Sequence, residues 1–429
     1  MKFSASTLLV VVGAGNTVFS SALVTATRAF SATASTRTFL SVSPVAEPPK
    51  VEKATAEFER HAPIGKDGEG EYTASTKGCF DVIDEATPYV MQAIQTIPAA
   101  KSKETVFTVA DYGTADGGTS LGLMAKIVKA VRAESSEDRE IQINYEDQRE
   151  NEWKSVFNHA LGVKQVTDAY GNVLETPRTD ALSGIFVSAC GVGFHEQAFP
   201  SNSIDLGVSF TAMHWLSQAP NSLKGDATMH SAQSDAPPEA ERLQAAQDWK
   251  SILEARSKEL RKGGRMVIAN FCKSKEGYFL GNTDTGASMW ESFQTCWDRL
   301  AEEALIDEEE RLGISFPNYY RTSEECLRGV EQVDGLKVID CVEKVVPCPY
   351  REAWNAGNKA GRTAREQAQW FVPTTRTWSE STFKNALKSH QDKEAIMDKF
   401  WSNYVDLVAE DPSIHGMDYA HTYLVIEKE

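Results

Sequence analysis

Residues 106–119 read Val-Phe-Thr-Val-Ala-Asp-Tyr-Gly-Thr-Ala-Asp-Gly-Gly-Thr, and they decide the fold class. The apolar run 106–110 is typical of a buried parallel strand, and it leads directly into Asp111 and Gly113. A turn of small residues follows, with Gly117 and Gly118. Beyond the turn, apolar residues recur at helical spacing: Leu121, Met124, Ala125 and Val128. The stretch therefore predicts a strand, a glycine turn and a helix.

The glycine turn is a candidate ligand site, because ligands of open α/β sheets bind at the carboxyl edge of the strands. Glycine lets the backbone approach a ligand closely, since no Cβ intervenes. The segment lacks the G-x-G-x-x-G pattern of dinucleotide sites and the lysine of a phosphate-binding loop. An acid at the strand end with sparse glycines suits S-adenosylmethionine better, because that cofactor has no phosphate. A tight structural turn is the alternative.

Predicted strands and helices alternate along the chain after this stretch. Strands are predicted at 141–145, which ends near Glu146 and Asp147, and at 184–189, 204–210 and 265–270. A long amphipathic helix is predicted at 239–260, stopped by Gly263 and Gly264. Strands that alternate with helices indicate a parallel sheet with helices on both faces.

The later part of the chain adds two features to this sheet. Segments 336–346 and 422–427 are predicted strands that could pair at an edge. Two helical blocks, about 284–312 and 351–405, carry several tryptophans and are expected to cap the sheet edge. A Pro/Ser/Asp/Gly tract at 219–238 predicts a surface loop. We expect one domain, 49–429, with the two blocks as cap insertions.

Composition limits the class of protein. The 429 residues suffice for one large domain with insertions or for two domains, and 41% hydrophobic with 24% charged residues is ordinary for a soluble protein. The formal charge of −17 argues against a nucleic-acid partner, because phosphate binding needs a basic surface. No two of the seven cysteines form a C-x-x-C pair, so we expect reduced, mostly buried thiols.

The first 46 residues contain no Asp or Glu. Lys2 precedes an apolar stretch at 8–12, and a Ser/Thr/Ala-rich tract with Arg28 and Arg37 follows. A signal-like part before a transit-like part resembles the bipartite plastid presequences of algae with secondary plastids, and Ala29-Phe30 resembles their cleavage site. We therefore expect a presequence at 1–48 and a plastid location. A simple secretory signal is the alternative.

Six short segments, in order from about residue 65 to 345, carry a family resemblance. They are 65–72 (Gly-Lys-Asp-Gly-Glu-Gly-Glu-Tyr), 110–113 (Ala-Asp-Tyr-Gly), 199–205 (Phe-Pro-Ser-Asn-Ser-Ile-Asp), 213–220 (Met-His-Trp-Leu-Ser-Gln-Ala-Pro), 263–267 (Gly-Gly-Arg-Met-Val) and 319–325 (Tyr-Tyr-Arg-Thr-Ser-Glu-Glu). Together they resemble the SABATH family of small-molecule methyltransferases. That family includes plant carboxyl methyltransferases of salicylate, benzoate and jasmonate, and N-methyltransferases of caffeine synthesis.

The resemblance implies a Rossmann-like class I methyltransferase sheet with a helical cap, and S-adenosylmethionine as cofactor. Tyr72 and Thr76 fall where the family closes over the cofactor, and Asp111 and Gly113 where it holds the methionine end. Asp147 falls on the ribose-binding acid. Gly193 and Phe194 would flank the adenine. A solvated turn acid is the alternative for Asp111 and Asp147, and a core aromatic for Phe194.

The resemblance also places the methyl acceptor. His214 and Trp215 line the acceptor side in the family, with His195 as a lesser candidate; the alternative is a core histidine and a core tryptophan. Cys79 stands where the family has a glutamine that contacts cofactor and acceptor carboxylate, and Thr211 where plant members usually have tyrosine. Residues 313–316, Gly-Ile-Ser-Phe, lack the acid of the family's magnesium segment, so no metal is predicted.

These observations predict a methyltransferase of a small-molecule acceptor, with a carboxylate oxygen as the first choice. N- or S-methylation and a catalytically silent cofactor-binding protein are alternatives, and a nicotinamide oxidoreductase is disfavoured by the missing fingerprint. Neither a nucleic acid nor, in the mature form, a membrane is an expected partner. A homodimer is left open.

Overall fold

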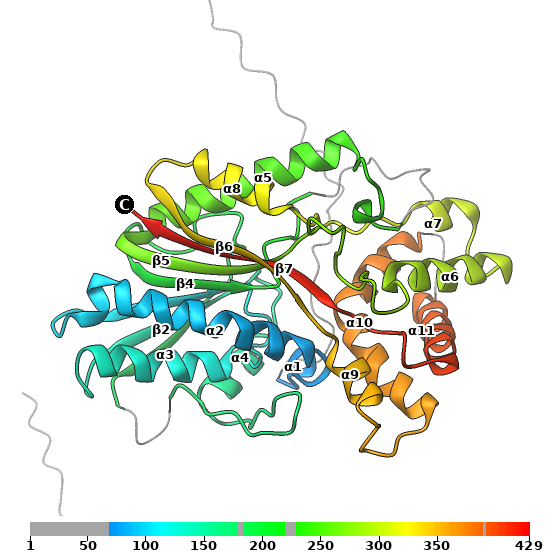
Figure 1. Ribbon diagram of the computed structural model, residues 1–429, viewed down its shortest axis with the longest axis horizontal. Coiled ribbons are helices and arrows are strands. Elements are labelled where there is room, and N and C mark those ends of the chain that lie inside the picture. Colours follow the sequence, from blue (N-terminus) through cyan, green and yellow to red (C-terminus); the bar gives the residue numbers. More distant parts are fainter. Residues whose placement is uncertain (1–67, 179–182, 219–228, 389–391) are drawn as a thin grey trace, which may run out of the picture. The chain divides into compact units, whose positions relative to one another are not determined.

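In the part of the chain that the structure describes, seven strands form one central sheet (Figure 1). The computed structural model describes residues 68–178, 183–218, 229–388 and 392–429, all within Ala56–Glu429, the second of two units. The predicted presequence 1–48 lies outside the described residues, as do 65–67 and 219–220 of two motifs. No helix in the described part is long and apolar enough to cross a membrane.

The sheet has the order β3-β2-β1-β4-β5-β7-β6. Its strands are β1 Phe107–Tyr112, β2 Ile141–Glu146, β3 Ile185–Cys190, β4 Ile204–Phe210, β5 Leu260–Phe271, β6 Leu336–Val346 and β7 Tyr419–Lys428. The first five run parallel, while β7 pairs antiparallel with both β5 and β6. The predicted α/β sheet and the pairing of the two late strands are thus confirmed.

The strand order reverses direction between β1 and β4. From β1 the chain moves outward to β2 and β3, and it returns to the other side of β1 with β4 and β5. At such a reversal the loops after the two central strands diverge, which leaves a crevice at the carboxyl edge. The sheet topology therefore locates the ligand site independently of any motif.

Helices cover both faces of the sheet (Figure 1). One core holds apolar residues of α2 Gly78–Thr96, α3 Leu121–Glu134 and α4 Trp153–Ala160 against alternate residues of the strands, such as Phe107 and Val109. The other core lies under α5 Glu239–Glu259 and α8 Ser323–Glu331, and takes the opposite strand residues Ala110 and Tyr112. This two-sided burial is why β1 and β4 consist of buried residues throughout.

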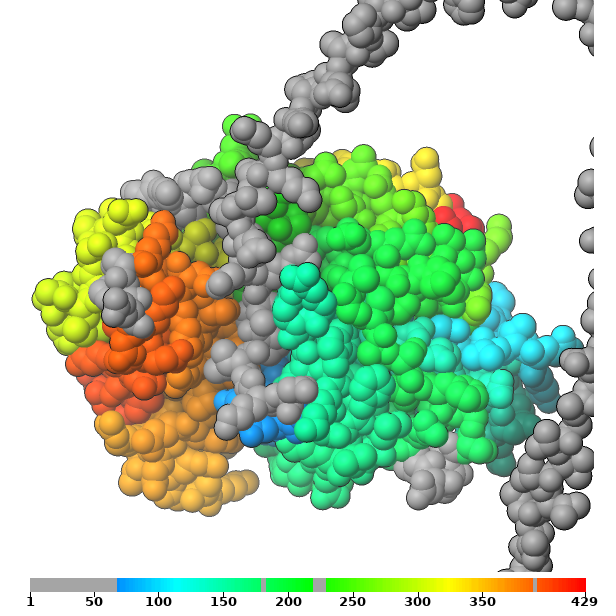
Figure 2. Space-filling model, turned by 180° about the vertical axis from the view of Figure 1, so that it is seen from behind, coloured from blue at the N-terminus to red at the C-terminus, as the bar shows by residue number. Residues whose placement is uncertain are grey.

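The remaining helices gather beyond the carboxyl edge of the sheet. They are α6 Met289–Glu302, α7 Glu308–Leu312, α9 Pro349–Asn355, α10 Ala364–Ala386 and α11 Lys393–Glu410, and they lie within or next to the two segments expected to form a cap. Phe293 of α6 packs against Phe383 of α10 and Tyr404 of α11, so aromatic contacts join the three longer helices. Seen from behind, the C-terminal helices form a block to one side of residues 150–250 (Figure 2). The short α1, Glu71–Ser75, lies at the same edge.

Three boundaries differ from the expectation, and each difference has a local cause. Val106 is 37% exposed and lies outside β1, which extends instead to Tyr112. The long helix ends at Glu259 and β5 begins at the next residue, because Leu260 already pairs with Ile204. The two glycines that were expected to precede this strand lie inside an irregularity of it, where Gly263 has φ 76°.

The predicted surface loop 219–238 is described only from residue 229 onward, and this part is not all surface. A short 3-10 helix, Ser231–Gln233, follows His230, which is 1% exposed. The rings of His230 and Tyr320 stack with their centroids 4.3 Å apart. Burial lowers the pKa of His230 to about 4. All seven cysteines are free and five are buried, as their spacing predicts.

Candidate active site

A cavity of about 780 Å³, a volume that includes space open to solvent, lies where the loops after β1, β2, β3 and β4 meet. Eight of the residues singled out from the sequence line it: Tyr72, Gly113, Asp147, Gly193, Phe194, His195, Thr211 and Trp215. Other lining residues were not predicted, among them Ala115, Gln148 and Leu216. We call this the cofactor cavity.

A second cavity of about 410 Å³, again including space open to solvent, adjoins the first. Its wall is aromatic and apolar, with Phe271, Leu280, Trp378 and Met417 added to Thr76, Cys79, His214 and Tyr419. Tyr72, Thr211 and Trp215 line both cavities, so these three side chains mark the junction. Because the sequence predicts an acceptor role for His214 and Trp215, we call the second space the acceptor cavity.

Gly113 brings the backbone of the first loop to the cavity wall. Its φ is 73°, and a Cβ at this position would overlap the Cβ of Ala212. Its N–H donates to the Glu146 carbonyl at 2.9 Å, which ties the end of β1 to the end of β2. Only glycine fits this close contact between the β1 and β4 loops.

Asp147 is the acid of the cofactor cavity. Its Oδ2 accepts a hydrogen bond from Ala115 N at 2.8 Å, and its Oδ1 accepts from Gln148 N at 2.8 Å. Burial raises the pKa of Asp147 to about 6. Burial also raises the pKa of the neighbouring Glu146 well above its usual range. The carboxyl edge thus holds two acids close to one another, which ionise less readily than free carboxyls.

Asp111 lines neither cavity. Its Oδ2 accepts hydrogen bonds from Ser120 Oγ at 2.6 Å and from Thr114 Oγ1 at 3.1 Å, and the residue is 2% exposed. These contacts join the end of β1 to the start of α3. Asp147 therefore lines the cofactor cavity, whereas the hydrogen bonds of Asp111 lie within the glycine turn.

The short helix α1 is held over the junction by acids that the sequence did not single out. Thr73 N donates to Asp116 Oδ2 at 2.8 Å, and the Thr73 hydroxyl donates to Asp116 Oδ1. Gly68 N and Gly70 N both donate to Glu152 Oε1, at 2.9 and 3.0 Å. These bonds place Tyr72 where both cavities meet. Asp116 lies inside the opening stretch of sequence, but nothing there indicated its partner 43 residues away.

The junction itself is polar but uncharged. Tyr72 Oη lies 3.8 Å from Cys79 Sγ, and burial raises the pKa of both the phenol and the thiol. Thr211 has φ 57°, an unusual conformation for a β-branched residue. Backbone strain of this kind is found mainly where a site fixes a side chain.

The segment that carries His214 and Trp215 is held by residues just before α8. Tyr319 N donates to the His214 carbonyl at 2.9 Å, and Arg321 Nη1 donates to the Met213 carbonyl at 2.9 Å. The His214 ring packs edge-on against Phe271 with centroids 4.7 Å apart. His195 Nε2 lies 3.0 Å from the Trp215 carbonyl oxygen. His195 therefore contacts the backbone of the segment that carries His214 and Trp215.

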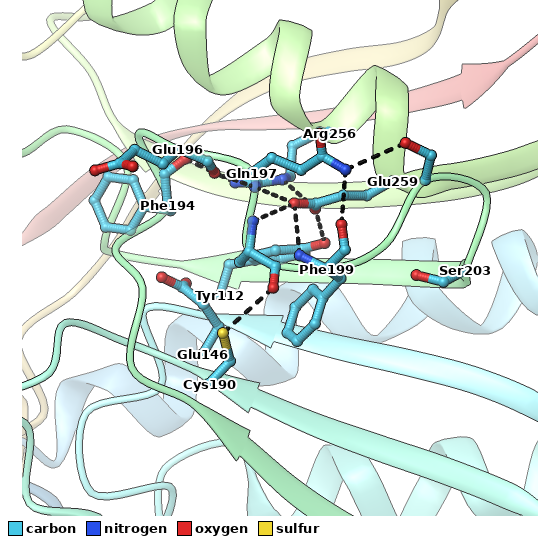
Figure 3. A network of polar contacts seen from close by, with 12 residues as sticks. Tyr112, Glu146, Cys190, Phe194, Glu196, Gln197, Phe199, Ser203, Arg256 and Glu259 are labelled. Atoms are coloured by element: carbon cyan, nitrogen blue, oxygen red, sulfur yellow. Dashed lines mark hydrogen bonds and ion pairs between the residues drawn. The ribbon is translucent and has the colours of Figure 1, made fainter.

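A buried ion pair holds the loop that carries Gly193 and Phe194 (Figure 3). Arg256 and Glu259, at the end of α5, are both fully buried and 2.8 Å apart. Arg256 donates to the carbonyls of Phe194 and Glu196, each at 2.8 Å. Glu259 Oε1 accepts from the backbone N–H of Ala198 at 2.6 Å and of Phe199 at 3.1 Å. No pattern in the sequence indicated this network, because its partners are about 60 residues apart along the chain.

Comparison with known proteins identifies the family. A sequence profile of the SAM dependent carboxyl methyltransferases matches residues 60–429. The chain belongs to this family. It is 28% identical, over 80% of its own length and 89% of the other's, to a Theobroma cacao protein named "Probable 7-methylxanthine methyltransferase 2". It is 24% identical to the benzoic acid/salicylic acid carboxyl methyltransferase 1 of Petunia hybrida, over 85% and 97% of the two chains.

A solved structure of a loganic acid methyltransferase with S-adenosylhomocysteine shares the fold. Its TM-score is 0.64 at 20% identity, and the match covers 85% of this chain and 98% of that one. The sheet is thus that of a class I methyltransferase, and the SABATH resemblance is confirmed. The protein is an S-adenosylmethionine-dependent methyltransferase, and the predicted cofactor is confirmed.

Proposed function

We propose that this enzyme methylates a carboxylate oxygen of a small acid whose body is largely apolar. The observation that carries the proposal is the acceptor cavity, where no described lining residue is Lys, Arg, Asp or Glu and most of the wall is aromatic or aliphatic. Such a wall suits a ring or hydrocarbon body. The names of the Petunia and loganic acid relatives, which act on carboxylic acids, support the same choice.

The cofactor cavity fits S-adenosylmethionine. Gly113 offers backbone at the wall without a side chain, and Asp147 offers a carboxylate to sugar hydroxyls. We assign Gly193 and Phe194 to the adenine side, and Tyr72 and Thr76 to closing the site from α1. When bound, the cofactor supplies a methyl group on a positively charged sulfur, already activated for transfer.

The remaining work of the protein is to position the acceptor and to exclude water. Trp215 lies at the junction and offers a flat face together with an indole N–H that can donate to a carboxylate oxygen. Tyr72 of α1 and Thr211, the residue after β4, complete the wall of the junction. An ionised carboxylate is already a nucleophile, so no side chain has to remove a proton from it.

N-methylation of a ring nitrogen is the second candidate. The relatives named as 7-methylxanthine methyltransferases favour it. Cys79 also favours it, since a buried thiol with a raised pKa is a poor donor to a carboxylate. The two products differ chemically, because a methyl ester is cleaved by mild base and an N-methyl group is not.

The test is transfer of labelled methyl groups to a panel of aromatic carboxylic acids and xanthines, followed by base treatment of the product. Label released as methanol supports the carboxylate, and label retained on a xanthine replaces it by the second candidate. His214→Gln should keep most of the maximal rate with a carboxylate acceptor, because no general base is needed. A fall of roughly 10²-fold would instead indicate an acceptor that must lose a proton. Trp215→Ala should raise the Michaelis constant of the acceptor and leave that of the cofactor nearly unchanged.

We further propose that residues 1–48 direct the enzyme to a plastid. The support is compositional: this segment lacks acids in its first 46 residues and has a signal-like part before a transit-like part.

A further inference from the structure

A groove runs between α5 and α8, which lie side by side on one face of the sheet (Figure 1). Its volume of about 520 Å³ includes space open to solvent. Trp249 joins the two helices, because its Nε1 donates to the Cys326 carbonyl at 3.0 Å. The lining residues include Arg242, Arg321 and Arg328. We call this space the arginine groove.

Positive charge is in excess in the arginine groove, although the whole chain has a formal charge of −17. Beside the three arginines, the one acid among the described lining residues is Glu325, so two positive charges are left over. Glu325 is itself engaged, since its Oε1 accepts from Tyr319 Oη at 3.2 Å and its Oε2 accepts from the backbone at the start of α8. Within the described chain, no carboxylate forms an ion pair with any of the three arginines.

Arg321 is the buried cation of the groove. It is 1% exposed, and its guanidinium donates to the carbonyls of Met213 at 2.9 Å and Ala245 at 2.8 Å. Asp248 also acts on Arg321 through its charge, but both Asp248 oxygens accept hydrogen bonds from Ser217, and Asp248 does not line the groove. A buried cation held by carbonyls retains a desolvation cost, which an anion in the groove offsets.

Arg242 and Arg328 supply the donors that a ligand can reach. Both side chains are exposed, one on α5 and one on α8. A guanidinium presents its N–H groups as a planar fork that matches the oxygens of a phosphate or a carboxylate. Leu243 is also exposed and lines the same groove, so apolar surface lies next to the donors.

From this arrangement we propose that the arginine groove binds a small dianion with an apolar body, such as an aryl phosphate ester or an aryl dicarboxylate. Two negative charges match the two positive charges that Glu325 leaves unbalanced, and Leu243 contacts the apolar body. The site is separate from methyl transfer, because the groove shares no lining residue with the cofactor cavity or the acceptor cavity.

Calorimetry at pH 8 with three probes tests the proposal. Phenyl phosphate carries two charges on one group, isophthalate carries one on each of two groups, and benzenesulfonate carries a single charge. The phosphate is a dianion at this pH because the second pKa of a phosphate ester is about 6. Each titration contains saturating S-adenosylhomocysteine, so that the cofactor cavity is filled.

The test variant is the double substitution Arg242→Gln/Arg328→Gln, which removes the two exposed arginines. The matched control is Lys250→Gln/Lys258→Gln, because it also removes two positive charges from the surface, at positions of α5 outside the groove. The single variant Arg328→Gln is measured alongside, and it should show a smaller loss in the same direction. Thermal unfolding of each variant checks that the fold is intact.

Wild type and control should bind at least one of the two dianions, and the double arginine variant should bind it at least about 10-fold more weakly, the scale of a lost charge-assisted hydrogen bond. Benzenesulfonate should bind wild type at least about 10-fold more weakly than that dianion. The preferred dianion distinguishes a phosphate ester from a dicarboxylate.

Three results overturn the proposal. The first is a wild type that binds neither dianion at millimolar concentration. The second is equal binding by the arginine variants and the lysine control, which places the probe elsewhere, the acceptor cavity included. The third is benzenesulfonate that binds as tightly as the dianions, which removes the requirement for two charges.

Discussion

Two aspartates at neighbouring strand ends show what residue type alone can and cannot predict. Asp111 and Asp147 both follow from the alternating strand pattern, and the parallel pairing of β1 with β2 brings the two strand ends together. The two residues differ in their hydrogen-bond partners, and the strand pattern carries no information about those partners. Asp111 accepts hydrogen bonds from hydroxyls three and nine residues ahead, whereas Asp147 accepts only backbone N–H groups and keeps a place at the cavity wall.

The raised pKa of Asp147 leads to a prediction about cofactor binding. A carboxylate accepts sugar hydroxyls best when it is ionised, and burial raises the pKa of Asp147 to about 6. S-adenosylmethionine affinity, measured by calorimetry, should therefore increase as the pH rises from 5 to 7. Asp147→Asn should weaken binding by about 1–3 kcal/mol at pH 7.5 and should abolish that pH dependence. An unchanged affinity in the variant would show that the sugar is held elsewhere.

At the scale of elements, the sequence indicated each strand of the sheet but not the contacts that bring loops to the site. Tyr72 was found through its motif, while the acids that hold α1, Asp116 and Glu152, were not. Arg256 and Glu259 lie in α5, where the sequence pattern predicted a helix but not the role of these two side chains. Such pairs are set by the tertiary structure, since each joins segments that are far apart in the chain.

Gly118 tests whether the position of α1 matters. A Cβ at Gly118 would overlap the Thr73 side chain, so Gly118→Ala should displace α1 and weaken binding of both substrates. Gly122→Ala is the control, because its Cβ would meet Leu174 at an ordinary 3.5 Å and alanine favours the helix. Steady-state kinetics should show Michaelis constants raised about 10-fold or more in the first variant only. Equal values in both variants would mean that α1 does not close the site.

The Arg256–Glu259 pair leads to a second prediction at this scale. Arg256→Met leaves Glu259 buried without its partner and frees two loop carbonyls, so urea unfolding should show a loss of about 3–5 kcal/mol. Cofactor affinity should fall too, because the loop carries Gly193 and Phe194. Lys250→Met, which removes an exposed ion pair of the same helix, should change stability by about 0.5 kcal/mol or less. A similar small effect at Arg256 would count against a positioning role.

At the scale of the molecule, the fold could be predicted because its determinants are local and repeated. Buried parallel strands read as apolar runs, and their regular alternation with helices leaves few topologies. The acceptor cavity could not be predicted in the same way. Trp378 comes from α10, Leu280 from the loop after β5 and Tyr419 from β7, so its wall exists only once the cap has packed on the sheet. Family motifs supplied His214 and Trp215, but Tyr419 and Trp378 carry no motif that would have indicated them.

The chain outside the described residues carries the last prediction. If residues 1–48 serve only as an address, their removal should leave the thermal unfolding midpoint and the turnover number of the enzyme unchanged, because the sheet, the cap and both cavities lie within 68–429. The same 48 residues fused to a fluorescent protein should carry it into the plastid of an alga with secondary plastids. Substituting Phe30 should reduce that import, since the Ala29-Phe30 step resembles the cleavage site. Secretion of the fusion would favour the simple signal instead, and unfolding of the truncated enzyme would show that this segment contributes to the fold.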